Sequence, residues 1–497
     1  MKRSPWSRVL TICITLGVPL CLTRTGRTQS TGSGSSAQNT VDTPRPFNPG
    51  QNTTNPSAFA VQSQNPFLGS VPTGPVIPGT LQLSLRAAVD LALRTNLGYI
   101  DSEQDHQRSR AARIRALSTL LPQIGVESTE DYRNLVMDAL GTEKLGVPHV
   151  VQGYNYQAAH ATLQQHVVDF RAFHEVKAAS QELEASAASM ADARNIVVLA
   201  SVSSYLLVAA SQTRLETARA QFETAKTIES ILSSRVVHDL SPQIDEIRAH
   251  VAMRSAELRV TLATTTLEKD KLALTRIIGL PIEQEFALTD RLRFLETPPT
   301  DQAELLSKAS EKRQDLRAAR SRLDAAEQSV KAERAQRLPT VEVLANGGET
   351  GITYGHPYRV YDVEGRISVP IFTGRRIEAD VLDAKATADR RRAEFADTRA
   401  RAVFDVRTAL LDLTAASKSV EVSLENQALA VEGLRQAKDR FDVGVSNAAD
   451  LIQAQQSVAE AEDNRTASIY AHQVAKLMLI RATGTAEQDY ISYLGVH

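Results

Sequence analysis

The sequence has only two cysteines, one tryptophan and no marked excess of charge of either sign. Both cysteines, Cys13 and Cys21, lie within the first 25 residues, so a chain that has lost this segment has no thiol for disulfides or metal binding. The net charge of -2 excludes the cationic excess expected of a nucleic-acid-binding protein. After residue 25 no uninterrupted apolar run reaches the roughly 18 residues of a membrane-spanning helix. Any membrane contact is therefore expected from strands or surface helices.

Motifs of enzyme chemistry are also lacking. The sequence has no Gly-rich phosphate loop with its lysine, no His-Glu-x-x-His and no nucleophile elbow, so it predicts no enzyme, no catalytic site and no cofactor. Three histidines, His160, His166 and His174, suggest a metal site. Strand spacing separates the first two by about 20 Å, however, which favours ordinary surface histidines over metal ligands.

The composition that is present favours long helices. Hydrophobic residues make up 42% of the 497 residues and aromatic residues 5%, a balance typical of helical chains rich in alanine and leucine.

The first 25 residues have a charged start and an apolar stretch from Val9 to Leu22, which predicts a secretory signal peptide. Cys21 is an alternative lipid-attachment site, although Leu20 replaces the small residue that this processing requires. Residues 26–80, rich in Ser, Thr, Gly and Pro, are expected to form a disordered leader.

The remaining chain contains an internal duplication, with a first repeat at residues 81–280, a linker at 281–299, a second repeat at 300–485 and a tail at 486–497. Leu121-Pro122 matches Leu338-Pro339, 217 residues later. Gly279 falls opposite Gly484, 205 residues later. Two copies imply two equivalent structural modules.

Each repeat shows the same succession of periods. Residues 83–120 and 300–337 have helical composition, and each stretch ends at a Leu-Pro pair, where proline stops a helix. A β-hairpin is expected next, at about 123–170 and 340–372, since apolar and polar residues alternate there, most clearly from Asp362 to Ile371. Tyrosines are concentrated in these hairpins, which suits either rings at a membrane interface or ordinary β-propensity.

A very long helix follows each hairpin, predicted from Arg171 to Val237 and from Arg375 to Phe441. At 1.5 Å per residue each helix is about 100 Å long. The second shows apolar residues spaced alternately by three and four positions, as in a coiled coil. Shorter helices return to Ile278 and Thr483 and end at glycines. Each repeat is therefore expected to be a rod with a β-hairpin at one end and a helical turn, its tip, at the other.

The tips span residues 235–245 and 440–450, called here the first tip and the second tip. In the second, Gly444 suits a positive φ, and Ser446 or Asn447 is placed to cap the return helix. In the first, Ser241 is expected to cap, with Pro242 at the first helical position. Four strands per chain cannot close a barrel, and open edges in lipid cost several kcal/mol per unpaired group. Several chains must therefore close it together.

Together these features resemble the TolC family of outer-membrane efflux ducts, over essentially residues 81–485. The residues that carry the resemblance are the opening stretch Leu81–Asn96, the two Leu-Pro pairs, Pro370-Ile-Phe-Thr-Gly-Arg375, Arg440-Phe-Asp-Val-Gly-Val-Ser446, Asp450-Leu-Ile-Gln-Ala-Gln455 and Arg481-Ala-Thr-Gly484. The order of these motifs, and their duplication, is more specific than any one of them. The chain departs from the pattern where Asp239 replaces the tip glycine, and where Val167–Arg171 lacks the glycine of the second strand exit.

The resemblance implies a mainly α fold with a small transmembrane β part. Duplicated long-helix coiled-coil hairpins would form an α-barrel, and four strands per chain would contribute to a twelve-stranded trimeric β-barrel. It also implies a homotrimer in outer-membrane lipid with a periplasmic extension. The implied partners are a periplasmic membrane-fusion adaptor and an inner-membrane efflux pump, with no nucleic acid. The duct would be passive, and the partner pump would supply the energy.

We expect the tips to form the closed end of the duct and to contact the adaptor. The residues proposed for gating or adaptor contact are Arg235, Asp239, Ser241, Asp245, Arg440, Asp442, Gly444, Ser446 and Asp450. For Asp245 and Asp450, a simpler interpretation is a carboxylate in the first turn of a helix, stabilised by the helix dipole. A periplasmic adaptor or a structural coiled-coil protein is the alternative function, but an adaptor would have many more strands and a coiled-coil spacer would have none.

Overall fold

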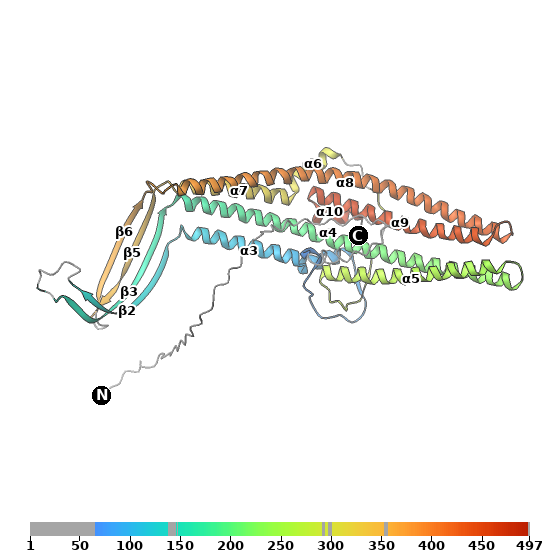
Figure 1. Ribbon diagram of the computed structural model, residues 1–497, viewed down its shortest axis with the longest axis horizontal. Helices are drawn as coiled ribbons and strands as arrows, with labels where there is room; N and C mark the ends of the chain where they lie inside the picture. The colour runs from blue at the N-terminus through green and yellow to red at the C-terminus, as the bar shows by residue number, and fades with distance from the viewer. Residues whose placement is uncertain are drawn as a thin grey trace, which may run out of the picture. The chain divides into compact units, whose positions relative to one another are not determined.

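The computed structural model describes residues 65–137, 146, 148–290, 294–296, 301–351 and 356–495. Contacts divide the chain into residues 1–46 and residues 47–497, and every described residue belongs to the second unit. The predicted signal peptide and leader residues 26–64 lie outside the described residues. Within the second unit, long helices run side by side, with a four-stranded sheet at one end and two helical turns at the other (Figure 1).

Both repeats have the expected order of elements. The first contains α2 (Leu85–Thr95), α3 (Leu97–Ser118), β2 (Gln123–Val136), β3 (Val150–Val168), α4 (Phe170–Val237) and α5 (Gln243–Ile278). The second contains α6 (Gln302–Lys312), α7 (Gln314–Ala335), β5 (Thr340–Gly351), β6 (Tyr358–Ser368), α8 (Arg376–Asp442) and α9 (Ala448–Thr483). The two long helices, α4 with 68 residues and α8 with 67, match the predicted length.

The sheet has the antiparallel order β2-β3-β5-β6. Its register places apolar residues in rows, and one row aligns Ile124, Leu163, Ala345 and Val363 across the four strands. Because side chains alternate between faces, the adjacent positions Thr162, Asn346 and Asp362 share the opposite face. The predicted alternation therefore produces one apolar and one polar face.

The helix before each hairpin was predicted to be continuous, and this prediction is wrong. Asn96 separates α2 from α3, and Arg313 separates α6 from α7, each with an extended backbone. Asn96 caps α3 by accepting a hydrogen bond from the backbone N–H of Gly98 at 3.0 Å, while the Arg313 side chain makes no such cap. The two residues are 217 residues apart, so the break is part of the duplication.

Each return helix ends against such a break. Gly279 and Gly484 follow α5 and α9 with φ of +73° and +80°, in the left-handed region. A Cβ atom on Gly484 would lie 2.8 Å from the Cα of Arg313, and one on Gly279 would lie 2.4 Å from Oγ1 of Thr95. The predicted terminal glycines are thus needed both for the turn and for close approach to the broken helix.

Residues 65–80, predicted to be disordered, are ordered and are called here the strap. The strap contains the short 3-10 helix η1 (Pro66–Leu68), and its Phe67 ring lies against Gly98. The side-chain amide of Asn96 donates to the Phe67 carbonyl at 2.8 Å, and the backbone N–H of Thr73 donates to the Gly279 carbonyl at 3.1 Å. Short-range composition gave the wrong prediction because these contacts join the strap to residues far along the chain.

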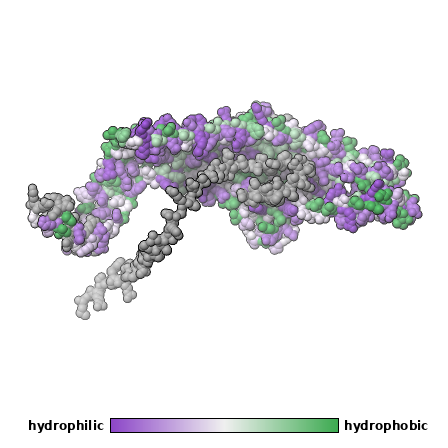
Figure 2. Space-filling view, viewed as in Figure 1, coloured by the Kyte–Doolittle hydropathy of each residue, from purple (hydrophilic) through white to green (hydrophobic). Residues whose placement is uncertain are grey.

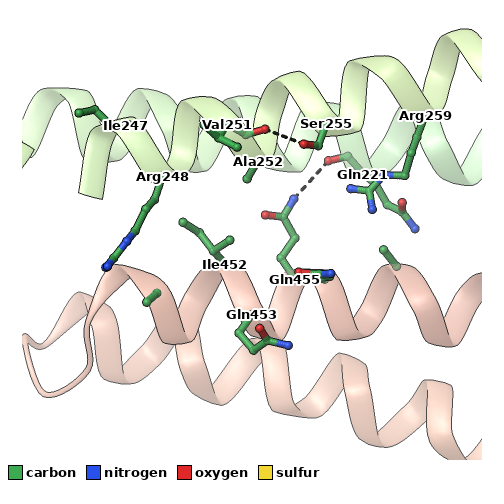
Figure 3. A pocket seen from close by; sticks show the side chains of 13 residues that line it. Gln221, Ile247, Arg248, Val251, Ala252, Ser255, Arg259, Ile452, Gln453 and Gln455 are labelled. Carbon is green, nitrogen blue, oxygen red and sulfur yellow. Dashed lines mark hydrogen bonds between the residues drawn. The ribbon is translucent and has the colours of Figure 1, made fainter. Parts of the chain in front are cut away.

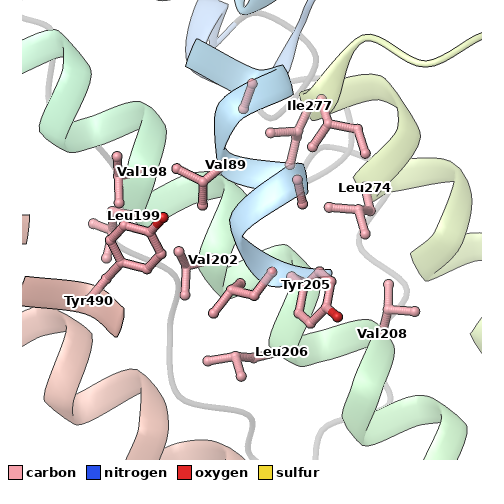
Figure 4. Packing of buried hydrophobic residues seen from close by; sticks show 14 of the residues in the cluster. Val89, Val198, Leu199, Val202, Tyr205, Leu206, Val208, Leu274, Ile277 and Tyr490 are labelled. Carbon is pink, nitrogen blue, oxygen red and sulfur yellow. The ribbon is translucent and has the colours of Figure 1, made fainter. Parts of the chain in front are cut away.

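Three further elements were not predicted. The strands β1 (Leu81–Leu83) and β4 (Phe286–Leu288) form a parallel pair that joins the start of the first repeat to the linker. The expected C-terminal tail contains α10 (Ala486–Leu494), whose Tyr490 and Leu494 are buried. Figure 4 shows Tyr490 in one cluster with residues of α2, α4 and α5. Tyr205 of α4 is also buried there, and its hydroxyl donates to Asp290 at 2.8 Å.

Helix α4 is the one described helix that is long and apolar enough to cross a membrane, with a mean hydropathy of 1.6 over its most apolar 18 residues. Polar residues such as Ser201 and Ser203 interrupt the apolar run, so the stretch does not stand out in the sequence. Of that window 72% is buried inside the protein, as in the central helix of a helical bundle.

Replacing Gly484 with alanine is expected to destabilise the protein more than replacing Gly444 with alanine. Both glycines have a left-handed φ, +80° and +75°, which costs alanine about 1 kcal/mol. Only Gly484 has backbone atoms within 4 Å of the added Cβ, which adds an overpacking cost of about 1–3 kcal/mol. Thermal unfolding of the detergent-solubilised protein measures the difference, and equal midpoints for the two variants would contradict this explanation.

Candidate functional site

The two tips have the same backbone geometry. Asp239 and Gly444 both adopt a positive φ, +55° and +75°. The backbone N–H of Leu240 donates to the carbonyl of Arg235 at 2.8 Å, and that of Val445 donates to the carbonyl of Arg440 at 2.9 Å. Aspartate tolerates the left-handed conformation better than most residues with a side chain. The replacement of glycine by Asp239 therefore leaves the shape of the first tip unchanged.

The caps of the two return helices differ. In the second tip, Asn447 caps α9 by accepting the backbone N–H of Asp450 at 2.9 Å, and the Ser446 hydroxyl donates to the Asp450 carboxylate at 2.7 Å. In the first tip, Pro242 occupies the cap position and no side chain caps α5, so the prediction of a Ser241 cap with Pro242 at the first helical position is wrong. The first turn of α5 instead contains Asp245, whose carboxylate lies 3.7 Å from the Arg248 guanidinium.

Arg235 joins the two tips. Its guanidinium lies 4.2 Å from the centre of the Phe441 ring, donates to the Phe441 carbonyl at 3.4 Å and lies 3.8 Å from the Asp442 carboxylate. Beneath these contacts Phe441 packs in an apolar cluster with Leu232 of α4 and Leu451 of α9. The tips are therefore held together by a cation–π contact, an ion pair and apolar burial.

The predicted site residues form two pairs, not one cluster. Arg235 meets Asp442 across the tips, and Ser446 meets Asp450 within the second tip. Among the described residues, the side chains of Asp239, Ser241, Asp245 and Arg440 make no hydrogen bond or ion pair with another member of the predicted set. Asp239 and Gly444 contribute through backbone conformation.

A groove of about 430 Å³ lies beside the tips, between α4, α5 and α9 (Figure 3). Arg248 and Arg259 of α5 line it, and the Gln455 amide of α9 crosses it to donate to the Gln221 carbonyl of α4 at 3.3 Å. Local sequence patterns do not reveal this groove, because one of its walls comes from α9, far along the chain from α4 and α5. Its lining is mixed, with cationic, amide and aliphatic side chains.

A buried group of charges joins four elements in the middle of the helical body. The guanidinium of Arg313 lies 2.7 Å from Asp315 and 2.8 Å from Asp405, and that of Arg481 lies 2.9 Å from Asp192. Burial raises the pKa of Asp192, although the ion pair with Arg481 opposes this shift. Removing one member would leave a buried charge unpaired, which is strongly destabilising.

Lys476 of α9 is a second buried cation, with only 1% of its surface exposed. Its ammonium donates to the backbone carbonyls of Leu295 in the linker and Tyr493 in α10, at 2.5 and 3.3 Å. Burial lowers its pKa to about 8 and lowers the pKa of the neighbouring His472 to about 4. Lys476 therefore ties the linker and the C-terminal helix to the bundle.

Comparison with known proteins supports one family. The model of the family described as "Outer membrane efflux protein" matches residues 305–485. The cobalt-zinc-cadmium resistance protein CzcC of Cupriavidus metallidurans is 26% identical over 288 residues, covering 58% of this chain and 67% of CzcC. The outer membrane protein TolC of Vibrio cholerae is 25% identical over 321 residues, covering 59% of this chain and 69% of that protein. The alignments thus span about two thirds of each relative.

Solved structures show the same fold. The Campylobacter jejuni CmeC outer membrane channel superposes with a TM-score of 0.73 at 16% identity, covering 86% of this chain and 95% of CmeC. The outer-membrane channel OprN superposes with a TM-score of 0.71 at 18% identity, covering 81% of this chain and 90% of OprN. The predicted fold of duplicated long helical hairpins with a small β part is therefore confirmed.

The stability of the wild-type protein relative to a Lys476→Met variant is expected to rise as the pH increases from about 8 to about 10. The folded-state pKa of Lys476 is about 8 and its ordinary value is 10.5, so the unfolded chain binds more protons in this range. Stability rises with pH wherever the unfolded state binds more protons. Unfolding midpoints of both proteins at several pH values measure the difference. A pH-independent difference would contradict a buried, destabilised ammonium.

Proposed function

We propose that the chain is a member of the outer membrane efflux protein family, whose model matches residues 305–485, and that three copies form an exit duct through the outer membrane. The family comprises channel and efflux proteins, not enzymes. In this proposal an inner-membrane pump supplies the energy, a periplasmic adaptor connects the pump to the duct, and the tips form the gate. The substrate passes through without any change in its covalent bonds.

The observation that carries the proposal is the unequal covering of duplicated helices. Helix α7 packs between α4 and α8, but its duplicate α3 packs on α4 and has no comparable contact with α8. Helix α9 likewise packs on α8 and α4, whereas its duplicate α5 packs mainly on α4. The free flank of α8 is equivalent to the flank of α4 that the second repeat covers. A second copy of the chain would supply the missing α3 and α5.

The exposed residues of α8 support this arrangement. Phe404 and Leu411 are 67% and 72% exposed, whereas their duplicates in α4, Leu199 and Leu206, are each 7% exposed. Apolar residues are interspersed with polar ones over the visible face of the helical body (Figure 2). Covering the flank of α8 with another copy would remove these large apolar side chains from water, at about 25 cal/mol per Å² of apolar area.

The sheet also needs neighbouring copies. Strands β2 and β6 are its two edges, and their backbone groups have no further strand to pair with among the described residues. Ile124 and Val126 on β2 and Val363 and Ile367 on β6 are largely exposed. Such an apolar face suits lipid, where unpaired edges are unfavourable and a closed barrel is required. Three sheets of four strands would close a barrel of twelve.

The proposed gate uses the contacts at the tips. Opening would separate the first tip from the second, with loss of the contacts from Arg235 to Phe441 and Asp442. The ion pair with Asp442 is partly exposed, and such a pair contributes about 1 kcal/mol or less, so adaptor binding could shift the population between two packings. The groove with Arg248 and Arg259 is accessible from the same end and would suit contact with the helices of an adaptor.

Purified full-length protein in detergent is expected to have the mass of three chains and to form ion-conducting channels in planar bilayers. A single conductance with long closed periods would fit a gate at the tips. The measurements are native mass determination and single-channel recording. A stable single-chain particle that needs no detergent would contradict the proposal and favour a periplasmic adaptor or spacer.

Replacing Asp450 with alanine is expected to leave the trimer intact and to increase the open fraction of the channel. The substitution removes the acceptor of the Ser446 hydroxyl and a carboxylate from the first turn of α9. Ser446→Ala is the matched control, because it removes the same hydrogen bond but keeps the carboxylate. If single-channel recordings of D450A match those of wild type, Asp450 serves only to stabilise the start of α9.

A further inference from the structure

Both residues of the buried ion pair between Asp192 and Arg481 recur at the equivalent positions of the other repeat. The segment Ala191-Asp-Ala-Arg194 of α4 recurs in α8 as Ala396-Asp-Thr-Arg399, and Lys476-Leu-Met-Leu-Ile-Arg481 of α9 corresponds to Lys271-Leu-Ala-Leu-Thr-Arg276 of α5. Asp397 is therefore the counterpart of Asp192, and Arg276 is the counterpart of Arg481. Both pairs of counterparts are separated by 205 residues.

The two members of the duplicate pair are exposed within one chain. Asp192 and Arg481 are 16% and 20% exposed and lie 2.9 Å apart, whereas the Asp397 side chain is 70% exposed. Asp397 lies 3.4 Å from Arg401 on its own helix, and the exposed side chain of Arg276 has no ion-pair partner among the described residues. The chain thus contains an acid and a base equivalent to a buried pair, but on helices that do not pair with each other.

We propose that Asp397 of one copy forms an ion pair with Arg276 of the next copy and so fixes the register of the interface. This inference rests on the proposed assembly of several copies. In the proposed ring, a rotation that superposes the first repeat on the second also superposes the second repeat on the first repeat of the neighbouring copy. It places α4 at the position of α8, and α9 at the position of α5 of that copy. It therefore carries the pair Asp192–Arg481 onto Asp397 of one copy and Arg276 of the next.

A second contact between α4 and α9 also has counterparts 205 positions away on α8 and α5. Within one chain the Gln221 amide of α4 donates to the Glu462 carboxylate of α9 at 3.1 Å. The residues 205 positions away are Asn426 of α8 and Glu257 of α5. An amide donor and a carboxylate acceptor are thus kept in both places, although Asn426 is exposed and the Glu257 carboxylate is paired with Arg254 of its own helix, at 2.7 Å. A preserved donor and acceptor at a second level of the same helices supports the interface.

The surroundings of the new pair are also partly preserved. Arg276 precedes Gly279 by three residues, as Arg481 precedes Gly484, and both glycines lie against a helix break. In the second repeat that break carries Arg313, which contributes positive charge near Asp192. In the first repeat it carries the neutral Asn96. The ion pair between copies would therefore rely on the charge of Arg276 alone, whereas both Arg481 and Arg313 stabilise the charge of Asp192.

Crosslinking of full-length protein tests the proposal. A variant with Asp397→Cys and Arg276→Cys is treated with a short bis-maleimide, since an Arg–Asp pair places its Cα atoms farther apart than a disulfide can bridge. The expected product is a ladder of two and three linked chains on a denaturing gel. The matched control, Asp192→Cys with Arg481→Cys, is expected to link within the chain and give no ladder. Each single variant and the wild type are run beside them.

Charge reversal provides the second measurement. Asp397→Arg and Arg276→Asp are each expected to raise the dissociation constant of the assembly about tenfold, and the double reversal to recover most of that loss. Independent effects of the two reversals, or the absence of a ladder from a protein that still has the mass of three chains and conducts ions, would overturn this pair and leave the proposed duct intact. A monomeric, non-conducting wild type would overturn both.

Discussion

The structure depends on covering both flanks of the central helix α4. One flank is covered by α3 and α5 of its own repeat, and the other by α7 and α9 of the second repeat. This is why most residues of α4 from Val197 to Leu206 are buried, as Figure 4 shows in part. Its duplicate α8 is one residue shorter and is covered on only one flank, so apolar residues on its other flank are left exposed. The internal hydrogen bonds of a helix of about 100 Å do not stabilise it on their own, so packing against neighbouring helices must provide the remaining stability.

The two repeats have the same helix break but use different side-chain contacts to stabilise it. At each helix break, a short segment of extended backbone leaves polar groups that need partners. In the first repeat the neutral Asn96 and the strap supply them, with the Phe67 ring against Gly98. In the second repeat Arg313 supplies them with two carboxylates, Asp315 and Asp405. The equivalent of Gly98 is Asp315, so an aromatic contact in one repeat is replaced by an ion pair in the other.

Much of the fold could be predicted from the sequence because its signals are local and repeated. Leu121-Pro122 and Leu338-Pro339 stop helices, the alternation near Val363 specifies strands, and Gly279 and Gly484 end the return helices. The break at Arg313 could not be predicted, because arginine is a good helix former and only its distant partner Asp405 explains its conformation. The order of the strap, the burial of Lys476 and the packing of α10 likewise depend on contacts between distant segments.

At the candidate site, sequence alone identified the tips but not their contacts. Gly444 predicted a left-handed turn correctly, and the duplication located Asp239 at the equivalent position. The contact of Arg235 with Phe441 and Asp442 was not predicted in detail because it joins two turns more than 200 residues apart. The cap on α5 was placed one residue too early, since Pro242 itself occupies the cap position.

The different contacts at the two helix breaks have a consequence for how such a chain could have evolved. A ring built from six identical half-chains would have the same contacts at every break, either six copies of Arg313 with its acidic neighbours or six straps. In the present chain, charged contacts at the break of the second repeat alternate with neutral contacts at the break of the first. The two repeats have therefore become different from each other. Gene duplication would then have been followed by specialisation that makes a return to a single-repeat ancestor unfavourable.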